Sequence, residues 1–142
     1  MKKFFSILVS VLIVLGLASC SMKEENKVVG TWNVASATGT INEETRDITY
    51  LEAGTTFLFN SDGTMVVTPS EAWQKEGFKV LNGNWSINND ETVFVMTGSV
   101  TGNEEFASVV LGSYQVSTLS AGTMILRRNI ADMGDITITL KK

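Results

Sequence analysis

The chain has 142 residues, a net charge of −4, one cysteine and no histidine. The lack of histidine excludes Ser–His and Cys–His nucleophile pairs and imidazole metal sites. The acidic balance disfavours a nucleic-acid partner, because phosphate backbones are also negative. With Cys20 as the lone cysteine, no disulfide can form within the chain, and the length suits one domain.

The first nineteen residues have the pattern of a secretory signal peptide. Lys2 and Lys3 precede an apolar run over residues 4–18, which is followed by small residues. As a helix this run would extend only about 22 Å, whereas a bilayer core needs roughly 30 Å. An uncleaved membrane helix is the alternative. We expect residues 1–19 to be cleaved, which removes the two lysines and lowers the net charge from −4 to −6.

The sequence LASC, which ends at Cys20, resembles the lipobox of bacterial lipoproteins. The resemblance implies that Cys20 is lipidated and carries several acyl chains, enough for a stable membrane anchor. Ser21, where an Asp would favour the inner membrane, favours the outer membrane. The next stretch, SMKEEN, resembles the export tag of surface-displayed lipoproteins, or is simply a solvated tether. We therefore expect residues 20–27 to tether the protein in the cell envelope, at the outer membrane, with surface exposure as an option.

From residue 28 onward, short apolar runs alternate with turn residues. In FNSDGTMVV, INNDETVFV and LSAGTMIL a polar or glycine-containing turn leads into a threonine and an apolar run, which is a hairpin signal. Such strands indicate an antiparallel sandwich or a closed barrel, and the barrel is favoured because closure leaves no unpaired edge. The predicted strands are residues 28–37, 46–51, 55–60, 64–68, 78–87, 91–98, 106–118, 122–129 and 135–141.

One segment, TPSEAWQKEG, predicts a helix. Thr68 is placed to cap its start, Pro69 suits the first helical position, and Glu71 completes a capping box. Gly77 ends the pattern. We expect two helical turns that carry Trp73 close to the mouth of the barrel.

Two of the three tryptophans occupy the same local frame, in VVGTWNV and LNGNWSI. In each stretch a glycine, Gly30 or Gly83, comes two positions before the tryptophan, Trp32 or Trp85. A strand glycine leaves room for another segment to pack closely. We predict that both indoles lie inside the barrel and close one end of it.

The first-strand motif Gly30-Thr31-Trp32 resembles that of lipocalins. Together, VVGTWNV, FNSDGTMVV and GNWSINNDE resemble the lipocalin-like lipoproteins of Gram-negative bacteria. The resemblance implies an all-β, eight-stranded antiparallel up-and-down barrel over residues 28–142. In lipocalins a basic residue on a late strand packs over the first-strand tryptophan, so the resemblance implies this cation–π role for Arg127 or Arg128. Two solvated arginines are the alternative.

An eight-stranded barrel is either filled by its own side chains or able to hold one small ligand. Apolar and methionine-rich linings suit hydrophobic ligands, although the same pattern also describes a plain core. The other residues expected to face inward are Trp32, Val34, Trp85, Ile87 and Leu126. The expected ligand contacts are Phe57, Phe59, Met65, Val67, Trp73, Val95 and Met124.

The sequence lacks the Gly-x-Ser-x-Gly, Ser-x-x-Lys and phosphate-loop motifs. Asp62-Gly63 fails as a calcium loop, because Leu58 and Pro69 occupy positions that require acids. We expect no enzymatic activity, no metal and no cofactor.

Two functions fit the pattern. The first is a membrane-anchored barrel that binds a small hydrophobic ligand. The second is a solid-core module that docks an envelope protein or a glycan through acidic loops. Those loops contain Glu43, Glu44, Glu104 and Glu105.

Overall fold

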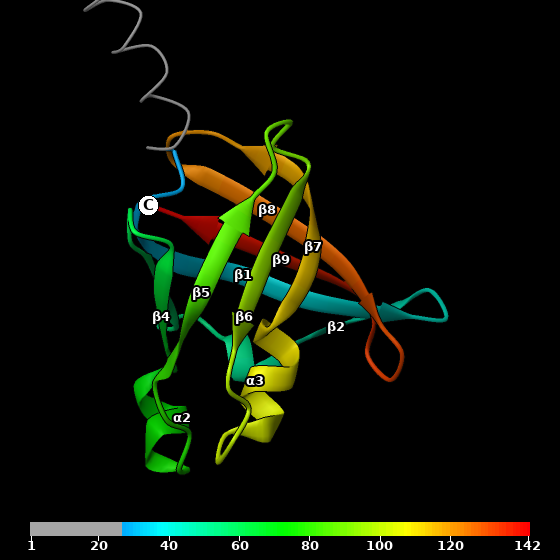
Figure 1. Ribbon diagram of the computed structural model, residues 1–142. Helices are drawn as coiled ribbons and strands as arrows, with labels where there is room; N and C mark the ends of the chain where they lie inside the picture. The colour runs from blue at the N-terminus through cyan, green and yellow to red at the C-terminus, as the bar shows by residue number, and fades with distance from the viewer. Residues whose placement is uncertain (1–26) are drawn as a thin grey trace, which may run out of the picture.

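Nine antiparallel strands form one sheet in the computed structural model, which describes residues 27–142 (Figure 1). They are β1 Gly30–Ile41, β2 Glu44–Asp47, β3 Thr56–Phe59, β4 Thr64–Thr68, β5 Leu81–Ile87, β6 Val93–Gly98, β7 Gly112–Leu119, β8 Thr123–Ile130 and β9 Gly134–Lys141. From β3 to β9 each strand pairs with the next, and β1 pairs with both β3 and β9. The predicted eight-stranded up-and-down barrel is therefore confirmed, and the sandwich alternative is wrong. The short β2 lies outside this ring and pairs with the end of β1.

The predicted helix is present as α2, Glu71–Lys75, and is shorter than expected. Its N-cap is Ser70, because Thr68 still belongs to β4 and pairs with Thr56. The Ser70 hydroxyl donates to the Glu52 carboxylate at 2.6 Å instead of capping the helix. The predicted strand over residues 46–51 divides into the end of β2 and a 3-10 turn, η1, Thr49–Leu51.

A second helix, α3, Glu104–Val110, occupies the first part of the strand predicted over residues 106–118. That prediction is wrong up to Gly112, where β7 begins. The segment EEFASVV buries Phe106, Ala107, Val109 and Val110, which is one face of a helix. Short apolar runs of this kind do not distinguish helix from strand by periodicity alone.

Side chains fill the interior of the barrel. Several have no exposed surface at all, as in a closely packed core. Among the predicted inward residues, Val34 and Met65 expose no more than 4% of their surface. Trp85 and Ile87 are half-buried against the same core. The fully buried side chains of the strands are Trp32, Phe57, Phe59, Val67, Phe94, Met124, Leu126, Ile136, Ile138 and Leu140.

The predicted inward position of Val95 is wrong by one residue. Phe94 and Met96 are buried, whereas Val95 between them faces outward. The run VFVM is apolar at every position, so it gives no alternation from which the facing could be read.

Both tryptophans pack on the core, as expected. Trp32 is fully buried and donates its indole N–H to the Val28 carbonyl at 2.7 Å. Trp85 is half-buried, stacks on Phe94 with ring centroids 5.8 Å apart, and donates to the Asn60 carbonyl at 2.9 Å.

Of the two glycines before the tryptophans, Gly83 lies against backbone and Gly30 lies against the end of a flexible lysine side chain. A Cβ at Gly83 would collide with the Thr97 carbonyl oxygen, and one at Gly30 would lie 2.9 Å from Lys142 Cε. That lysine places its ammonium 4.9 Å from the centre of a Trp32 ring. The cation–π partner of Trp32 among the described residues is thus Lys142 rather than Arg127 or Arg128.

The barrel has two distinct ends (Figure 1). The described chain begins and ends at one of them, which also carries the short turns at residues 60–63, 88–92 and 120–122; we call it the closed end. The opposite, helical end carries η1, α2 and α3. No helix within residues 27–142 has the length and apolar character needed to cross a bilayer.

Candidate functional site

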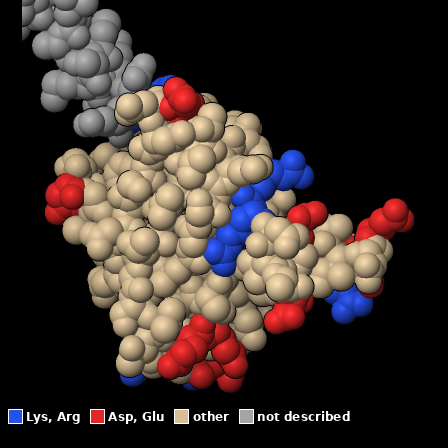
Figure 2. All heavy atoms as spheres, turned by 45° about the vertical axis from the view of Figure 1, so that its right-hand side comes forward, with Lys and Arg blue, Asp and Glu red and all other residues tan. Residues whose placement is uncertain are grey.

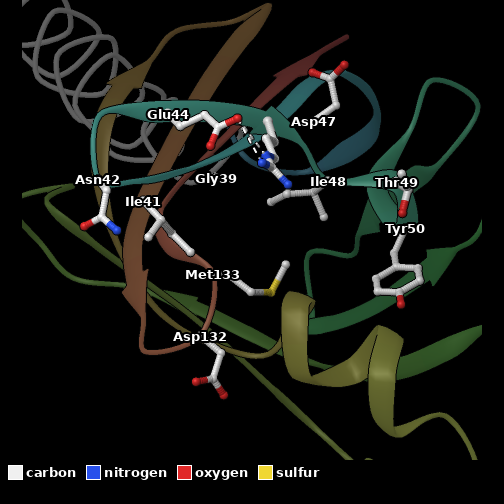
Figure 3. A pocket seen from close by; sticks show the side chains of 11 residues that line it. Gly39, Ile41, Asn42, Glu44, Asp47, Ile48, Thr49, Tyr50, Asp132 and Met133 are labelled. Carbon is white, nitrogen blue, oxygen red and sulfur yellow. Dashed lines mark hydrogen bonds and ion pairs between the residues drawn. The ribbon is translucent and has the colours of Figure 1, made fainter.

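A pocket of about 480 Å³ opens at the helical end of the barrel (Figure 3). One wall is the hairpin formed by β2 and the end of β1, which projects from the body of the molecule (Figure 1). In this hairpin Gly39 pairs with Arg46 and Ile41 pairs with Glu44, and all four residues line the pocket. The pocket is therefore lined by the part of β1 that extends past the filled core. We call it the mouth pocket.

Local sequence explains the projecting hairpin. Asn42 and Glu43 form its two-residue turn with φ of 51° and 68°, as a type I′ turn requires. Thr40 and Thr45 face each other across the strands with their hydroxyl oxygens 2.8 Å apart. The charged residues of the exposed β2 edge discourage pairing with another strand.

The lining of the mouth pocket is amphipathic. Ile41, Ile48, Tyr50 and Met133 supply apolar surface, and Ile41 is 44% exposed. The charged part of the lining comes from Asp132, at the turn between β8 and β9, and from side chains of β2. The β2 groups are Glu44, Arg46 and Asp47, of which Arg46 donates to the Glu44 carboxylate at 2.9 Å. Such a lining suits a small ligand with an apolar body and a polar group.

An aromatic cluster beside the pocket connects the three helical segments. Tyr50 of η1 packs edge-on against Trp73 of α2 with centroids 5.0 Å apart, and Trp73 stacks on Phe78 at 5.0 Å. Phe78 in turn lies 5.8 Å from Phe106 of α3. The Glu105 carboxylate beside the Tyr50 hydroxyl raises the pKa of Tyr50, chiefly through its negative charge. The pocket wall at Tyr50 is thus supported by both helices.

The structure separates the predicted ligand residues into groups. Phe57, Phe59, Met65, Val67 and Met124 come together, but in the filled core rather than at the pocket. Trp73 lies near the mouth, as expected, and reaches the pocket only through its contact with Tyr50.

Sequence reasoning missed the residues that do line the mouth pocket. Ile41 and Met133 lie between predicted strands, and Ile48 lies within the strand predicted over residues 46–51. An apolar residue among polar ones was the only signal. Cys20, the signal peptide and most of the predicted tether lie outside the described residues. No group of three or more acidic or cysteine side chains within residues 27–142 is placed to hold a metal ion.

A closed up-and-down barrel of eight strands with a pocket at its mouth is the architecture of lipocalin-like proteins. The chain belongs to the lipocalin-like domain family, whose model matches residues 28–126. A search of curated proteins found no match.

Two solved structures are similar to this one. The first is a lipocalin-like protein from Bacteroides uniformis, with a TM-score of 0.56 and 14% identity, covering 82% of this chain and 99% of that chain. The second is a DUF4847 family protein from Bacteroides vulgatus, with a TM-score of 0.53 and 15% identity, covering 83% and 95%. At these identities the likeness establishes the fold alone.

Proposed function

We propose that this protein is a lipid-anchored, lipocalin-like binding protein of the outer membrane that holds a small hydrophobic ligand. The mouth pocket carries this proposal. Its volume of about 480 Å³ lies within the range of about 300–1,000 Å³ common for ligand sites. Because the interior is filled, we place the ligand against Ile41, Ile48 and Met133 instead of among the core phenylalanines.

The position of the pocket agrees with a lipid anchor. Cys20 precedes Lys27 by seven residues, and Lys27 forms an ion pair with Glu91, which lies in a turn of the closed end. An anchor at Cys20 would therefore leave the mouth pocket at the end remote from the membrane. The role proposed is binding without catalysis, which is consistent with a histidine-free chain.

A fluorescent apolar probe tests the ligand site. The mature chain carrying Cys20→Ser, which removes the lipid, would be titrated with N-phenyl-1-naphthylamine. We expect saturable binding that weakens about tenfold in Ile41→Asp, because a carboxylate in the pocket must be desolvated when the probe binds. Val100→Asp is the matched control, since Val100 is similarly exposed at 48% and does not line the pocket. Absent or unsaturable binding, or equal weakening in both variants, would refute the proposed site.

The anchor has a separate test. Cells expressing the full chain would be grown with labelled palmitate, and the protein would be followed through membrane fractionation. We expect the label and the membrane association in the natural sequence and their loss in Cys20→Ala. An unlabelled natural protein would refute the anchor and leave the ligand site untouched.

The filled interior also favours the second candidate, a docking module. Acidic side chains gather at the lower end of the face shown in Figure 2 and on the protrusion to its right. If these acids bind an envelope partner, Glu104→Lys with Glu105→Lys would abolish co-purification of that partner, while Ile41→Asp would preserve it. The opposite pattern would favour the mouth pocket.

A further inference from the structure

A second cavity, of about 720 Å³, lies in the wall of the barrel between β7 and β8. These strands pair only from Gln115 with Arg127 to Leu119 with Met124. Toward the helical end, residues 112–114 pair with β6 alone and residues 128–130 pair with β9 alone. The two strands visibly separate there (Figure 1). We call this opening the seam; its lining shares no residue with the mouth pocket.

Arg128 occupies the inner side of the seam. Its guanidinium donates to the Leu111 carbonyl and, at 2.7 Å, to the Ser108 carbonyl at the end of α3. It also lies 4.9 Å from the centre of the Tyr114 ring. A Cβ at Gly112 would meet this guanidinium, and φ of 147° at Gly112 also favours glycine. The Arg128 Nε is buried and has no hydrogen-bond partner among the described residues.

Arg127 lies on the outer side of the seam and is exposed. Its single hydrogen bond to a described residue is a long one, 3.4 Å, to the Thr137 hydroxyl. Within residues 27–142 the ion pairs are Lys27–Glu91, Arg46–Glu44 and Lys75–Glu71, so neither seam arginine faces a carboxylate at ion-pair distance. In an acidic protein, two adjacent cations without acidic partners are a local positive centre.

The acid that lines the seam is already engaged. Asp135 accepts a hydrogen bond from the Asn129 amide at 2.9 Å. Basic side chains lie in a hollow of the face shown in Figure 2, with an acidic group close beside them. Because Arg127 is exposed, the positive centre is open to solvent on its outer side.

The interrupted pairing adds hydrogen-bond donors to this charge. Alternate residues of an antiparallel strand bond to opposite neighbours, so Ser113 of β7 and Asn129 of β8 direct their main-chain groups into the seam without a facing strand. Ser113, Gln115 and Asn129 add polar side chains along the same walls. Main-chain N–H groups next to arginines recognise oxyanions, since both supply donors and the guanidinium has a planar fork.

We propose that the seam binds a small oxyanion, with the Arg127 guanidinium and seam N–H groups as donors and Arg128 as a fixed neighbouring charge. The oxyanion is a phosphate or carboxylate, either free or displayed as a lipid headgroup. This site is independent of the mouth pocket and goes beyond the function proposed for it.

The test is a titration followed by NMR, with backbone amide and arginine Nε–H signals recorded on the mature chain carrying Cys20→Ser. The probes are inorganic phosphate and, in a separate arm, monomeric dihexanoyl phosphatidic acid. We expect saturable shifts at Ser113, Asn129 and Arg127. In Arg127→Gln the affinity falls about tenfold, as the loss of a charge-assisted contact predicts. Lys75→Gln removes the same charge from α2 and leaves the affinity unchanged.

Each outcome decides the question. Saturation by either probe that depends on Arg127 supports the seam site, and the tighter probe shows whether the free anion or the headgroup is preferred. Shifts that do not saturate, or an equal loss in Arg127→Gln and Lys75→Gln, overturn it. Ile41→Asp should leave these shifts intact, so failure of the mouth pocket and failure of the seam are distinguishable.

Discussion

The two ends of the barrel cover the core in different ways. At the closed end, short turns join the strands and the large rings of Trp32, Phe59, Trp85 and Phe94 fill the space between them. At the helical end the connections are longer, and η1, α2 and α3 cover the core through the cluster around Tyr50 and Phe78. Both cavities described above lie toward the helical end.

The difference shows where such a barrel has freedom to acquire a site. Packed aromatic side chains tolerate little change in volume, whereas chain that extends past the core is limited mainly by its own hydrogen bonds. At the projecting end of β1 the short β2 takes the place of β3 as its partner, and beside Arg128 strands β7 and β8 no longer pair. Substitutions at the two ends should therefore lower the free energy of unfolding by different amounts.

The largest contrast should come from the tryptophans. Trp32→Ala removes a fully buried ring and its hydrogen bond to Val28, and should lower the free energy of unfolding by about 3–5 kcal/mol. Trp73→Ala, in the half-buried cluster at the helical end, should cost about 1–2 kcal/mol. Urea unfolding measures both. Equal costs would contradict the distinction between the ends.

High pH should loosen the helical end through Tyr114. Its hydroxyl donates to the Val109 and Val110 carbonyls at the end of α3, and burial raises the pKa of Tyr114 to about 12. Between pH 10 and 12 the unfolded chain loses this proton while the folded chain keeps it, so stability falls as pH rises. The loss should reach about 2–3 kcal/mol.

Tyr114→Phe is the control for the pH effect. It removes the titrating hydroxyl, so the stability advantage of the natural protein over this variant should be constant below pH 9 and shrink above pH 10. Unfolding by urea at a series of pH values gives this difference directly. A difference that does not change with pH would contradict the assignment to Tyr114.

Arg128→Gln sharpens the comparison at the seam. The change leaves the Ser108 and Leu111 carbonyls without their donor and removes the cation from the Tyr114 ring. We expect a loss of about 1–3 kcal/mol in urea unfolding. Arg127→Gln, its exposed neighbour, should change stability by less than about 0.5 kcal/mol. A matching cost for the two would show that Arg128 does not hold α3 in place.

The smallest effect is expected at the exposed valine and isoleucine of the helical end. Ile41→Asp and Val100→Asp alter side chains that are 44% and 48% exposed, and each should shift stability by less than about 0.5 kcal/mol. Thermal unfolding checks this. A large destabilisation by Ile41→Asp would mean that the hairpin contributes to the core, and would weaken its use as a binding variant.

The strands were largely predictable, because their signals are local. Alternation in ITITL correctly gave the inward face of β9, and the Asp-Gly turn correctly separated β3 from β4. Where alternation vanished, prediction failed: VFVM misplaced Val95, and EEFASVV was read as a strand although it forms α3. A uniformly apolar run carries no information about which neighbour it will meet.

The candidate sites were hardly predictable. The mouth pocket joins Ile41 and Ile48 to Met133, and its walls meet only because β9 returns to pair with β1. The pairing of β9 with β1 also brings the Lys142 ammonium over the Trp32 ring. The family resemblance had suggested Arg127 or Arg128 for this contact. These contacts depend on how the strands are staggered around the barrel, a quantity that no single strand encodes.

By itself, then, the sequence determined an all-β chain of hairpin-linked strands with two tryptophans turned toward the core. It also supplied the features that predict export and a lipid anchor at Cys20. Only the tertiary structure decided that the interior is full, that β1 projects beyond it, and that β7 and β8 part at Arg128. The physical reason is the separation of the interacting residues along the sequence. Turn chemistry and alternation depend on residues close in the chain, whereas cavities depend on how distant segments pack together.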